Sequence, residues 1–182
     1  AEYKGIHGTK IQNYTSDPDN PLQGQVWYNE TANTLKYKYQ STATAWSTGG
    51  NLNVTRSFSA GAGTQTAALA IGTGSSPSAV TEAYNGTSWT AVNALNTGRY
   101  GLAAAGTQTA ALAFGGQTPT KVANTETWNG TNWTEVNDLN TARSLLAGAG
   151  TNTAALVFGG NIPPDSALTE LWNGTNWTEV ND

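Results

Sequence analysis

Apolar and polar residues alternate in short runs along most of this chain, a pattern typical of strands with one covered and one wetted face. The clearest case is the segment 125–136, in which two such runs flank Asn129-Gly130. Asn-Gly favours a tight hairpin, because a type I′ turn needs positive φ at both central residues. The pattern therefore predicts a β-hairpin with a two-residue turn.

A two-residue turn fixes which side chains meet across this hairpin. Trp128 would lie opposite Thr131, and Glu126 opposite Trp133. Trp128, Glu126 and Trp133 would then share one face, with the two indoles in diagonal contact. We expect such a face of large residues to pack against a face of smaller residues from a neighbouring unit.

The hairpin recurs at a period of about 44 residues, in the segments 84–89, 128–133 and 172–177. An arginine and a glutamate recur at nearly the same period, and these residues are Arg56, Arg99, Arg143, Glu82, Glu126 and Glu170. Internal repetition of this kind indicates an array of similar units. Counted from each arginine, the units are residues 56–98, 99–142 and 143–182.

Each unit reads as four short strands. In the middle unit we expect them at about 100–105, 109–114, 125–128 and 132–136. Four strands in this period are typical of a β-propeller blade, whereas leucine-rich repeats are shorter and helical repeats would show a 3.6-residue period. The sequence thus predicts an all-β fold with three four-stranded blades.

Residues 1–50 read differently from the repeats and predict a small N-terminal segment, separate from a repeat domain over 51–182. The segment 14–21 is rich in turn residues, and strands are expected at 25–29 and 34–39. Lys36 and Lys38 alternate with apolar residues, which predicts that the lysine face is the wetted one. We interpret the segment as an attachment module that contains a β-hairpin.

Composition narrows the classes of partner. Charged residues make up 11% of the chain and the net charge is −4, with no basic cluster. These features argue against binding to nucleic acid or to an anionic membrane. No apolar run reaches the length of a membrane helix, so we expect no membrane insertion. The chain begins at Ala1 rather than Met, and we expect processing or a longer gene product.

Metal-binding chemistry is sparse. The chain has no cysteine, and His7 is its only histidine. Asp17, Asp19 and Asn20 are spaced somewhat like a calcium loop, but Pro18 interrupts them and no glutamate follows at the required place. We therefore interpret this segment as an ordinary loop and expect no metal and no other cofactor.

The repeats resemble those of kelch-type β-propellers. Glycine pairs end the second strand in two units, an aromatic residue and a tryptophan follow, and an arginine opens the next unit; the pairs are Gly115-Gly116 and Gly159-Gly160. The first unit departs from this order with Gly72-Thr73-Gly74. In every unit the two aromatic residues are also closer together than in typical kelch repeats. Kelch loop functions therefore do not transfer directly.

A narrower resemblance covers nearly the whole chain. Repeats such as AGTQTAALAFGG and TETWNGTNWTEVNDLNTAR, and the leader IQNYTSDPDNPLQGQVWYNETANTLKYK, are similar to segments of tail-fibre and other virion proteins of marine bacteriophages, especially cyanophages. The resemblance implies a structural protein of the extracellular virion, with other virion proteins as partners. It implies no catalytic residue and no cofactor.

The repeated residues invite a functional and a structural interpretation. The three arginines could line a channel, and the tryptophans could stack on sugars. Residues that recur once per unit favour a structural role. We therefore expect the arginines to pair with the repeated glutamates or with turn carbonyls, and the tryptophans to lie in the core. Trp27 and Trp46 lie outside the complete units, and we expect these two to be more exposed.

Recognition is better sought in the connections between the second and third strands, which differ most among the units. They span 75–80, 117–122 and 161–168. Drift in unconstrained loops would explain the same variation. The candidate binding residues are Ser75, Ser76, Gln117, Thr118, Lys121, Asn161 and Asp165.

Three units are fewer than the four to eight blades of closed propellers. Two chains could pair into a six-bladed ring, the gene product could continue, or the blades could pack on other virion subunits; a homo-oligomer is expected. The leading function hypothesis is a non-enzymatic fibre or appendage that displays loops to a host-surface glycan or protein. A purely architectural module is the alternative. A polysaccharide-degrading enzyme is a third and less favoured hypothesis, because it would need clustered carboxylates and most of the few acidic residues stand at repeated positions.

Overall fold

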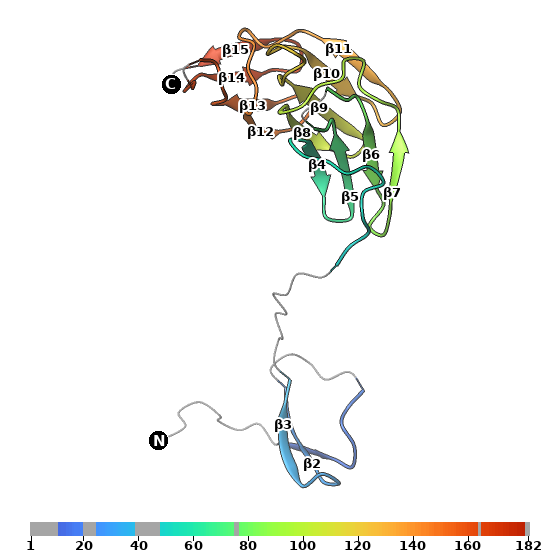
Figure 1. Ribbon diagram of the computed structural model, residues 1–182. Coiled ribbons are helices and arrows are strands. Elements are labelled where there is room, and N and C mark those ends of the chain that lie inside the picture. The colour runs from blue at the N-terminus through green and yellow to red at the C-terminus, as the bar shows by residue number, and fades with distance from the viewer. Residues whose placement is uncertain (1–10, 20–24, 39–47, 75–76, 164, 181–182) are drawn as a thin grey trace. The chain divides into compact units, whose positions relative to one another are not determined.

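The computed structural model describes residues 11–19, 25–38, 48–74, 77–163 and 165–180, in which every regular element is a strand. The all-β class predicted from the sequence is thus confirmed. The chain divides into two compact units, residues 1–47 and 48–182 (Figure 1). Among the described residues, no helix exists that could span a membrane.

The first unit contains one three-stranded sheet. Its strands are β1 (Gln12–Tyr14), β2 (Val26–Asn29) and β3 (Thr34–Tyr37), with β1 parallel and β3 antiparallel to β2. The two predicted strands are confirmed, although both are shorter than expected. Strand β1 was not predicted, because three residues are too few to show an alternating pattern.

The wetted face of this sheet is the reverse of the prediction. Lys36 lies opposite Trp27 in the register, and its Nζ is 2.6 Å from Oδ2 of Asp17. The Trp27 indole donates to Oδ1 of Asp17 at 3.0 Å and is only 5% exposed. Leu35 and Tyr37, on the other face, are 61% and 66% exposed. The prediction of an exposed Trp27 was also wrong, because the aspartate lies ten residues away and holds both side chains. Trp46 and Tyr39 lie outside the described residues.

The second unit contains three antiparallel sheets of four strands, each formed by consecutive strands. The first sheet is β4 (Ala60–Thr64), β5 (Ala67–Ile71), β6 (Thr81–Tyr84) and β7 (Trp89–Val92). The second is β8 (Ala103–Thr107), β9 (Ala110–Phe114), β10 (Thr125–Trp128) and β11 (Trp133–Val136). The third is β12 (Ala147–Gly150), β13 (Ala155–Phe158), β14 (Thr169–Trp172) and β15 (Trp177–Val180).

The strands of the middle unit match the prediction well at β10 and within one residue at β9 and β11. Strand β8 begins three residues later than predicted. Gly101 has a φ of +60°, which turns the chain just before the strand, and Tyr100 pairs instead with Gln117 in an isolated bridge. A positive φ is compatible with glycine but interrupts a strand.

The predicted register of the hairpin was wrong. Trp128 pairs directly with Trp133, so four residues form the turn, and only Gly130 in it has a positive φ, of +92°. The Asn129 side chain explains the larger turn, because its Oδ1 accepts from the N–H groups of Thr131 at 2.9 Å and Asn132 at 2.8 Å. The two indoles still share one face, with ring centroids 5.2 Å apart.

The three sheets pack face to face around two equivalent cores. Leu69 and Ile71 of the first sheet pack with the indoles of the second sheet. Leu112 and Phe114 of the second sheet pack in the same way with Trp172 and Trp177 of the third. The prediction that the repeated tryptophans lie in the core is confirmed for the second and third sheets.

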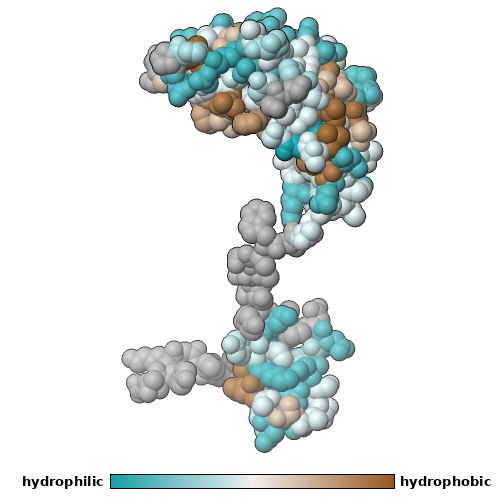
Figure 2. Space-filling view, in the orientation of Figure 1, coloured by the Kyte–Doolittle hydropathy of each residue, from teal (hydrophilic) through white to brown (hydrophobic). Residues whose placement is uncertain are grey.

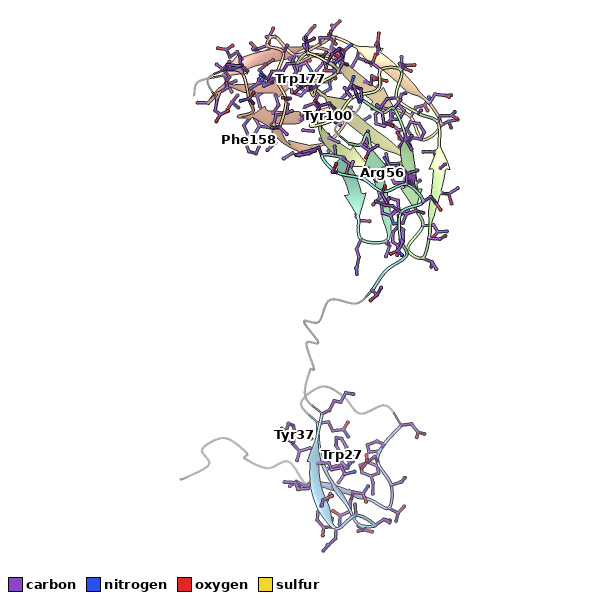
Figure 3. The ribbon with its side chains drawn as sticks, in the orientation of Figure 1. Trp27, Tyr37, Arg56, Tyr100, Phe158 and Trp177 are labelled. Atoms are coloured by element: carbon purple, nitrogen blue, oxygen red, sulfur yellow. The ribbon has the colours of Figure 1, made fainter. Side chains whose placement is uncertain are left out.

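Each sheet therefore has two different faces. We call the face with the aromatic pair the indole face, and the face with Leu69 and Ile71, or their equivalents, the aliphatic face. Each indole face packs on the aliphatic face of the preceding sheet. Hydrophilic residues cover most of the visible surface, and hydrophobic ones gather over β12 and β13 and over β5 and β6 (Figure 2). Figure 3 shows Trp177 inside the array and Phe158 at its edge.

Candidate recognition loops

The connections between the second and third strands of the three sheets all leave the same end of the sheets. They span residues 72–80, 115–124 and 159–168. The tight hairpins that join the third strand to the fourth lie at the opposite end, because neighbouring strands are antiparallel. The least repetitive segments of the array are thus gathered on one side.

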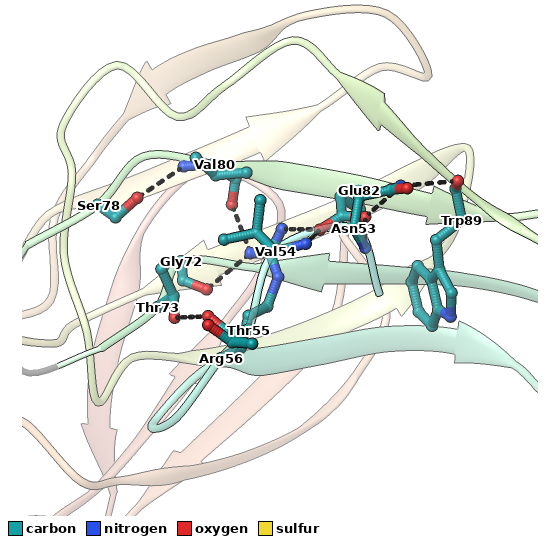
Figure 4. Close-up of polar contacts among 10 residues, drawn as sticks. All are labelled: Asn53, Val54, Thr55, Arg56, Gly72, Thr73, Ser78, Val80, Glu82 and Trp89. Atoms are coloured by element: carbon teal, nitrogen blue, oxygen red, sulfur yellow. Dashed lines mark hydrogen bonds and ion pairs between the residues drawn. The ribbon is translucent and has the colours of Figure 1, made fainter. Parts of the chain in front are cut away.

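A buried arginine holds the base of the first connection closed (Figure 4). Nη1 of Arg56 donates to the carbonyl oxygens of Gly72 at 2.8 Å and Val80 at 2.9 Å, which are the two ends of the connection. Arg143 does the same for the third connection, with Gly159 at 3.2 Å and Leu168 at 2.6 Å. In the second sheet, Arg99 donates to the carbonyl of Ala113 at 3.2 Å.

Each arginine pairs with the repeated glutamate of its own unit, as the sequence predicted. Arg56 lies 2.7 Å from Glu82, Arg99 lies 3.1 Å from Glu126, and Arg143 pairs with Glu170. All six side chains are almost fully buried. Because these guanidinium groups do not reach solvent, they do not line a channel for a ligand.

An asparagine from the preceding segment completes each ion pair. Asn96 donates its backbone N–H and its Nδ2 to Oε2 of Glu126 at 2.8 and 2.9 Å. Asn53 and Asn140 make the same contacts with Glu82 and Glu170. Sequence reasoning missed these residues, although a signal existed: an asparagine stands three positions before each repeated arginine.

The surroundings of two residues in these ion pairs shift their pKa values. Burial alone raises the pKa of Glu82, but hydrogen bonds from Arg56 and Asn53 outweigh it and lower that pKa from 4.5 to about 2. Burial lowers the pKa of Arg99, and the neighbouring Glu126 carboxylate opposes that shift. We call each buried Arg–Glu pair, with the backbone groups that it binds, a clamp. In the first clamp Glu82 therefore stays ionised well below neutral pH.

The second connection is anchored through Gln117, which exchanges backbone hydrogen bonds with Tyr100 at 2.8 and 3.1 Å. Thr118 donates its N–H to the carbonyl of Thr120 at 2.9 Å, so the tip forms a narrow turn. Gln117, Thr118 and Lys121 are all half-buried. Three of the predicted candidates are thus brought into one loop.

The third connection is anchored in the same way. Asn161 donates its N–H to the carbonyl of Ser144 at 2.7 Å and its Nδ2 to Oδ1 of Asp165 at 2.7 Å. Ser144 Oγ lies 3.4 Å from Oε1 of Gln117, which joins the second and third connections. Asp165 is exposed and Asn161 is half-buried. Ser75 and Ser76 lie outside the described residues.

Most of the exposed positions of these connections, Asp165 apart, were not among the candidates. They are Pro77, Pro119, Thr120, Pro163 and Ala167. A proline in each connection was the available signal, since proline is common at exposed turns. The described candidates are instead mainly the residues that hold the second and third connections in shape.

In the described part of the chain, no three His, Cys, Asp or Glu side chains form a group that could hold a metal ion. Asp17 is engaged by Lys36, Asn29 and Trp27, whose hydrogen bonds lower its pKa from 3.8 to about 2. His7 and Asn20 lie outside the described residues.

Comparison with known proteins adds no assignment. No protein-family model and no curated protein sequence matches the chain.

Proposed function

We propose that the three repeat sheets are kelch-like β-propeller blades. Each sheet contains four antiparallel strands in chain order, and the units recur with a period of about 44 residues. The first strands of the three sheets lie next to one another, as the inner strands of blades do around an axis. Within this architecture, the connections described above lie on one rim of the propeller.

The protein is, in this proposal, a non-enzymatic structural protein of a bacteriophage virion, such as a tail fibre. Its connections bind a host-surface glycan, its N-terminal segment attaches it to other virion proteins, and it acts without a cofactor. One observation carries the proposal: connections that differ between units stand together on a frame whose clamps are repeated in every unit. Rigid frames with variable loops are a common design for recognition.

A glycan array tests the recognition part. Labelled full-length chain is applied to an array of bacterial surface polysaccharides, beside a Thr118→Ala/Lys121→Ala variant. We expect the wild type to bind a subset of glycans and the variant to lose at least tenfold in affinity. The matched control is Thr131→Ala/Thr175→Ala, which changes exposed residues at the opposite end of the sheets. If no glycan binds, or if the control loses as much affinity as the loop variant, the proposal of glycan recognition is wrong.

A purely architectural role is the second candidate, and one observation favours it. The array leaves large apolar side chains exposed on its last sheet, among them Phe158 at 42% and Leu171 at 45%. Exposed apolar patches mark interaction surfaces. Under this alternative, loop variants would leave particle assembly and infection unchanged, whereas variants of the exposed sheet would impair assembly.

A further inference from the structure

The third sheet has an aliphatic face that nothing among the described residues covers. Phe158 on this face is 42% exposed, whereas its counterparts Ile71 and Phe114 are completely buried (Figure 3). Leu156 is half-buried, whereas its counterparts Leu69 and Leu112 are buried. The aliphatic face is thus covered in the first and second sheets and open in the third.

The first sheet has the complementary open surface, its indole face. This face contains a shallow hollow of about 380 Å³ whose lining includes Gly61, Ala68, Ala70 and Trp89. Hydrophobic residues over β5 and β6 are visible at this end of the array (Figure 2). Trp89 is half-buried, whereas the corresponding Trp133 and Trp177 are buried by the sheet before them.

The internal contacts show what such a pair of faces requires. Phe114 projects from an aliphatic face over Gly148 of the next sheet, where an added Cβ would come within 2.4 Å of its Cζ. The same ring meets Trp177 edge to face, with centroids 5.0 Å apart. A glycine under the phenylalanine is therefore a steric requirement of this contact.

The two internal contacts are matched in size. Ile71, at the position of Phe114, packs in the core to which Ala104, at the position of Gly148, contributes. The core with the smaller projecting residue thus has alanine at this position, and the core with the larger one has glycine. The open aliphatic face carries Phe158, and the open indole face carries Gly61 at the corresponding position. The two open faces therefore carry the combination of phenylalanine and glycine, as Phe114 and Gly148 do inside the array.

A backbone series runs through the array in the same direction. The N–H of Gly101 donates to the carbonyl of Phe58 at 2.8 Å, and the N–H of Leu145 donates to the carbonyl of Gly101 at 2.7 Å. All three residues have a φ between +53° and +60°. Within the described residues no backbone hydrogen bond extends the series, so the N–H of Phe58 and the carbonyl of Leu145 are its two ends.

We propose that the aliphatic face of the third sheet binds the indole face of the first sheet in a second copy of this chain. Phe158 then lies over Gly61 and against Trp89 of the second copy, and the Phe58 N–H of that copy meets the Leu145 carbonyl. The occupant is a second copy because the contact continues the interface already present twice in the chain, with the same size matching. A head-to-tail contact of this kind closes into a ring when its rotation allows.

The number of copies follows from the propeller architecture. Closed propellers contain four to eight blades, and two copies of three sheets give six, whereas three copies exceed that range. The contact between the faces rests on the array alone and is independent of a virion role. The count of two copies rests on the proposed propeller, and failure of glycan binding would leave both unaffected.

Sedimentation velocity of the full chain tests this proposal. We expect a species of about twice the 18.9 kDa of one chain. Phe158→Asp is expected to give a monomer, because a carboxylate would be buried against an indole. Since Phe158 is exposed in the single chain, the circular dichroism of Phe158→Asp should match that of the wild type. Leu35→Asp, at an exposed apolar residue of the first unit, is the control and should leave the pair intact.

Two results would overturn the contact between the faces, and a third would overturn the count of two copies. A wild type that stays monomeric at high concentration shows that the faces do not meet. Association that persists in Phe158→Asp shows that another surface is responsible. Open-ended assemblies larger than two copies show that the ring does not close.

Discussion

The buried arginine and glutamate side chains are the residues whose replacement we expect to destabilise this protein most. A buried charge whose partner is removed is left without compensation, which costs far more than loss of a surface pair. Each pair here is also linked to backbone: the arginine reaches carbonyls at the ends of a connection in two of the units, and the glutamate accepts from the preceding asparagine. One residue change should therefore loosen both a sheet and its connection.

Glu126→Ala is expected to lower the free energy of unfolding by about 3–5 kcal/mol, because Arg99 then remains buried without its partner. Urea denaturation measures this change. Glu135→Ala is the matched control, since Glu135 lies directly opposite in the register and is exposed. Its cost should be within about 0.5 kcal/mol. Equal costs for the two variants would contradict the role given to the buried pair.

Acid should weaken the first clamp in a defined range. The pKa of Glu82 falls from 4.5 in the unfolded chain to about 2 in the folded one. The folded state therefore gains stability from this group above pH 4.5, and loses that gain as the pH falls from 4.5 through 2. Denaturant unfolding across this range should give a shallower pH dependence for Glu82→Gln than for the wild type. Parallel profiles would show that Glu82 is not responsible.

At the scale of the element, strand positions were predictable, whereas contacts between distant segments that the repeat does not relate were not. Strand β10 was predicted well because alternation and the following Asn-Gly both mark its limits. The register of its hairpin was not, since the Asn129 side chain supports a longer turn than the dipeptide suggests. The covered face of β3 was missed because Asp17, far away in sequence, selects it.

The connections were likewise predictable in part. Their positions follow from the differences between units, and the Arg–Glu pairs follow from the repeat. The pairing of Gln117 with Tyr100 and of Asn161 with Ser144 does not, because neither pattern nor spacing relates these residues. The matched sizes of Phe114 and Gly148 also became meaningful only once the packing of the sheets was known.

The turn of the middle hairpin gives an element-scale prediction. Asn129→Ala removes two hydrogen bonds to backbone N–H groups and should cost about 1–2 kcal/mol. Thr131→Ala, in the same turn, keeps its backbone hydrogen bond and should cost little. Thermal unfolding of the two variants measures the difference. A hairpin held by the Asn-Gly backbone alone would tolerate both changes equally.

At the scale of the whole molecule, one interface accounts for the order of the array. Each sheet offers an aliphatic face and an indole face, and both kinds of face are open at the ends. Full burial of a phenylalanine contributes about 1.5–3 kcal/mol. Phe158 is already partly buried in the single chain, so the rest of both faces must supply most of the free energy of pairing. Pairing would also place the connections of both chains on a common rim, where weak binding sites act together.

The most direct test exchanges the sizes of the two residues at the proposed contact. Gly61→Ala should be tolerated by the single chain, because an added Cβ would meet only the Leu69 carbonyl at 3.7 Å. It should weaken pairing at least tenfold in sedimentation velocity, since Phe158 requires a glycine beneath it. Phe158→Ile/Gly61→Ala reproduces the internal combination of Ile71 and Ala104 and should restore pairing. Pairing unchanged by Gly61→Ala, or not restored in the double variant, would contradict the account.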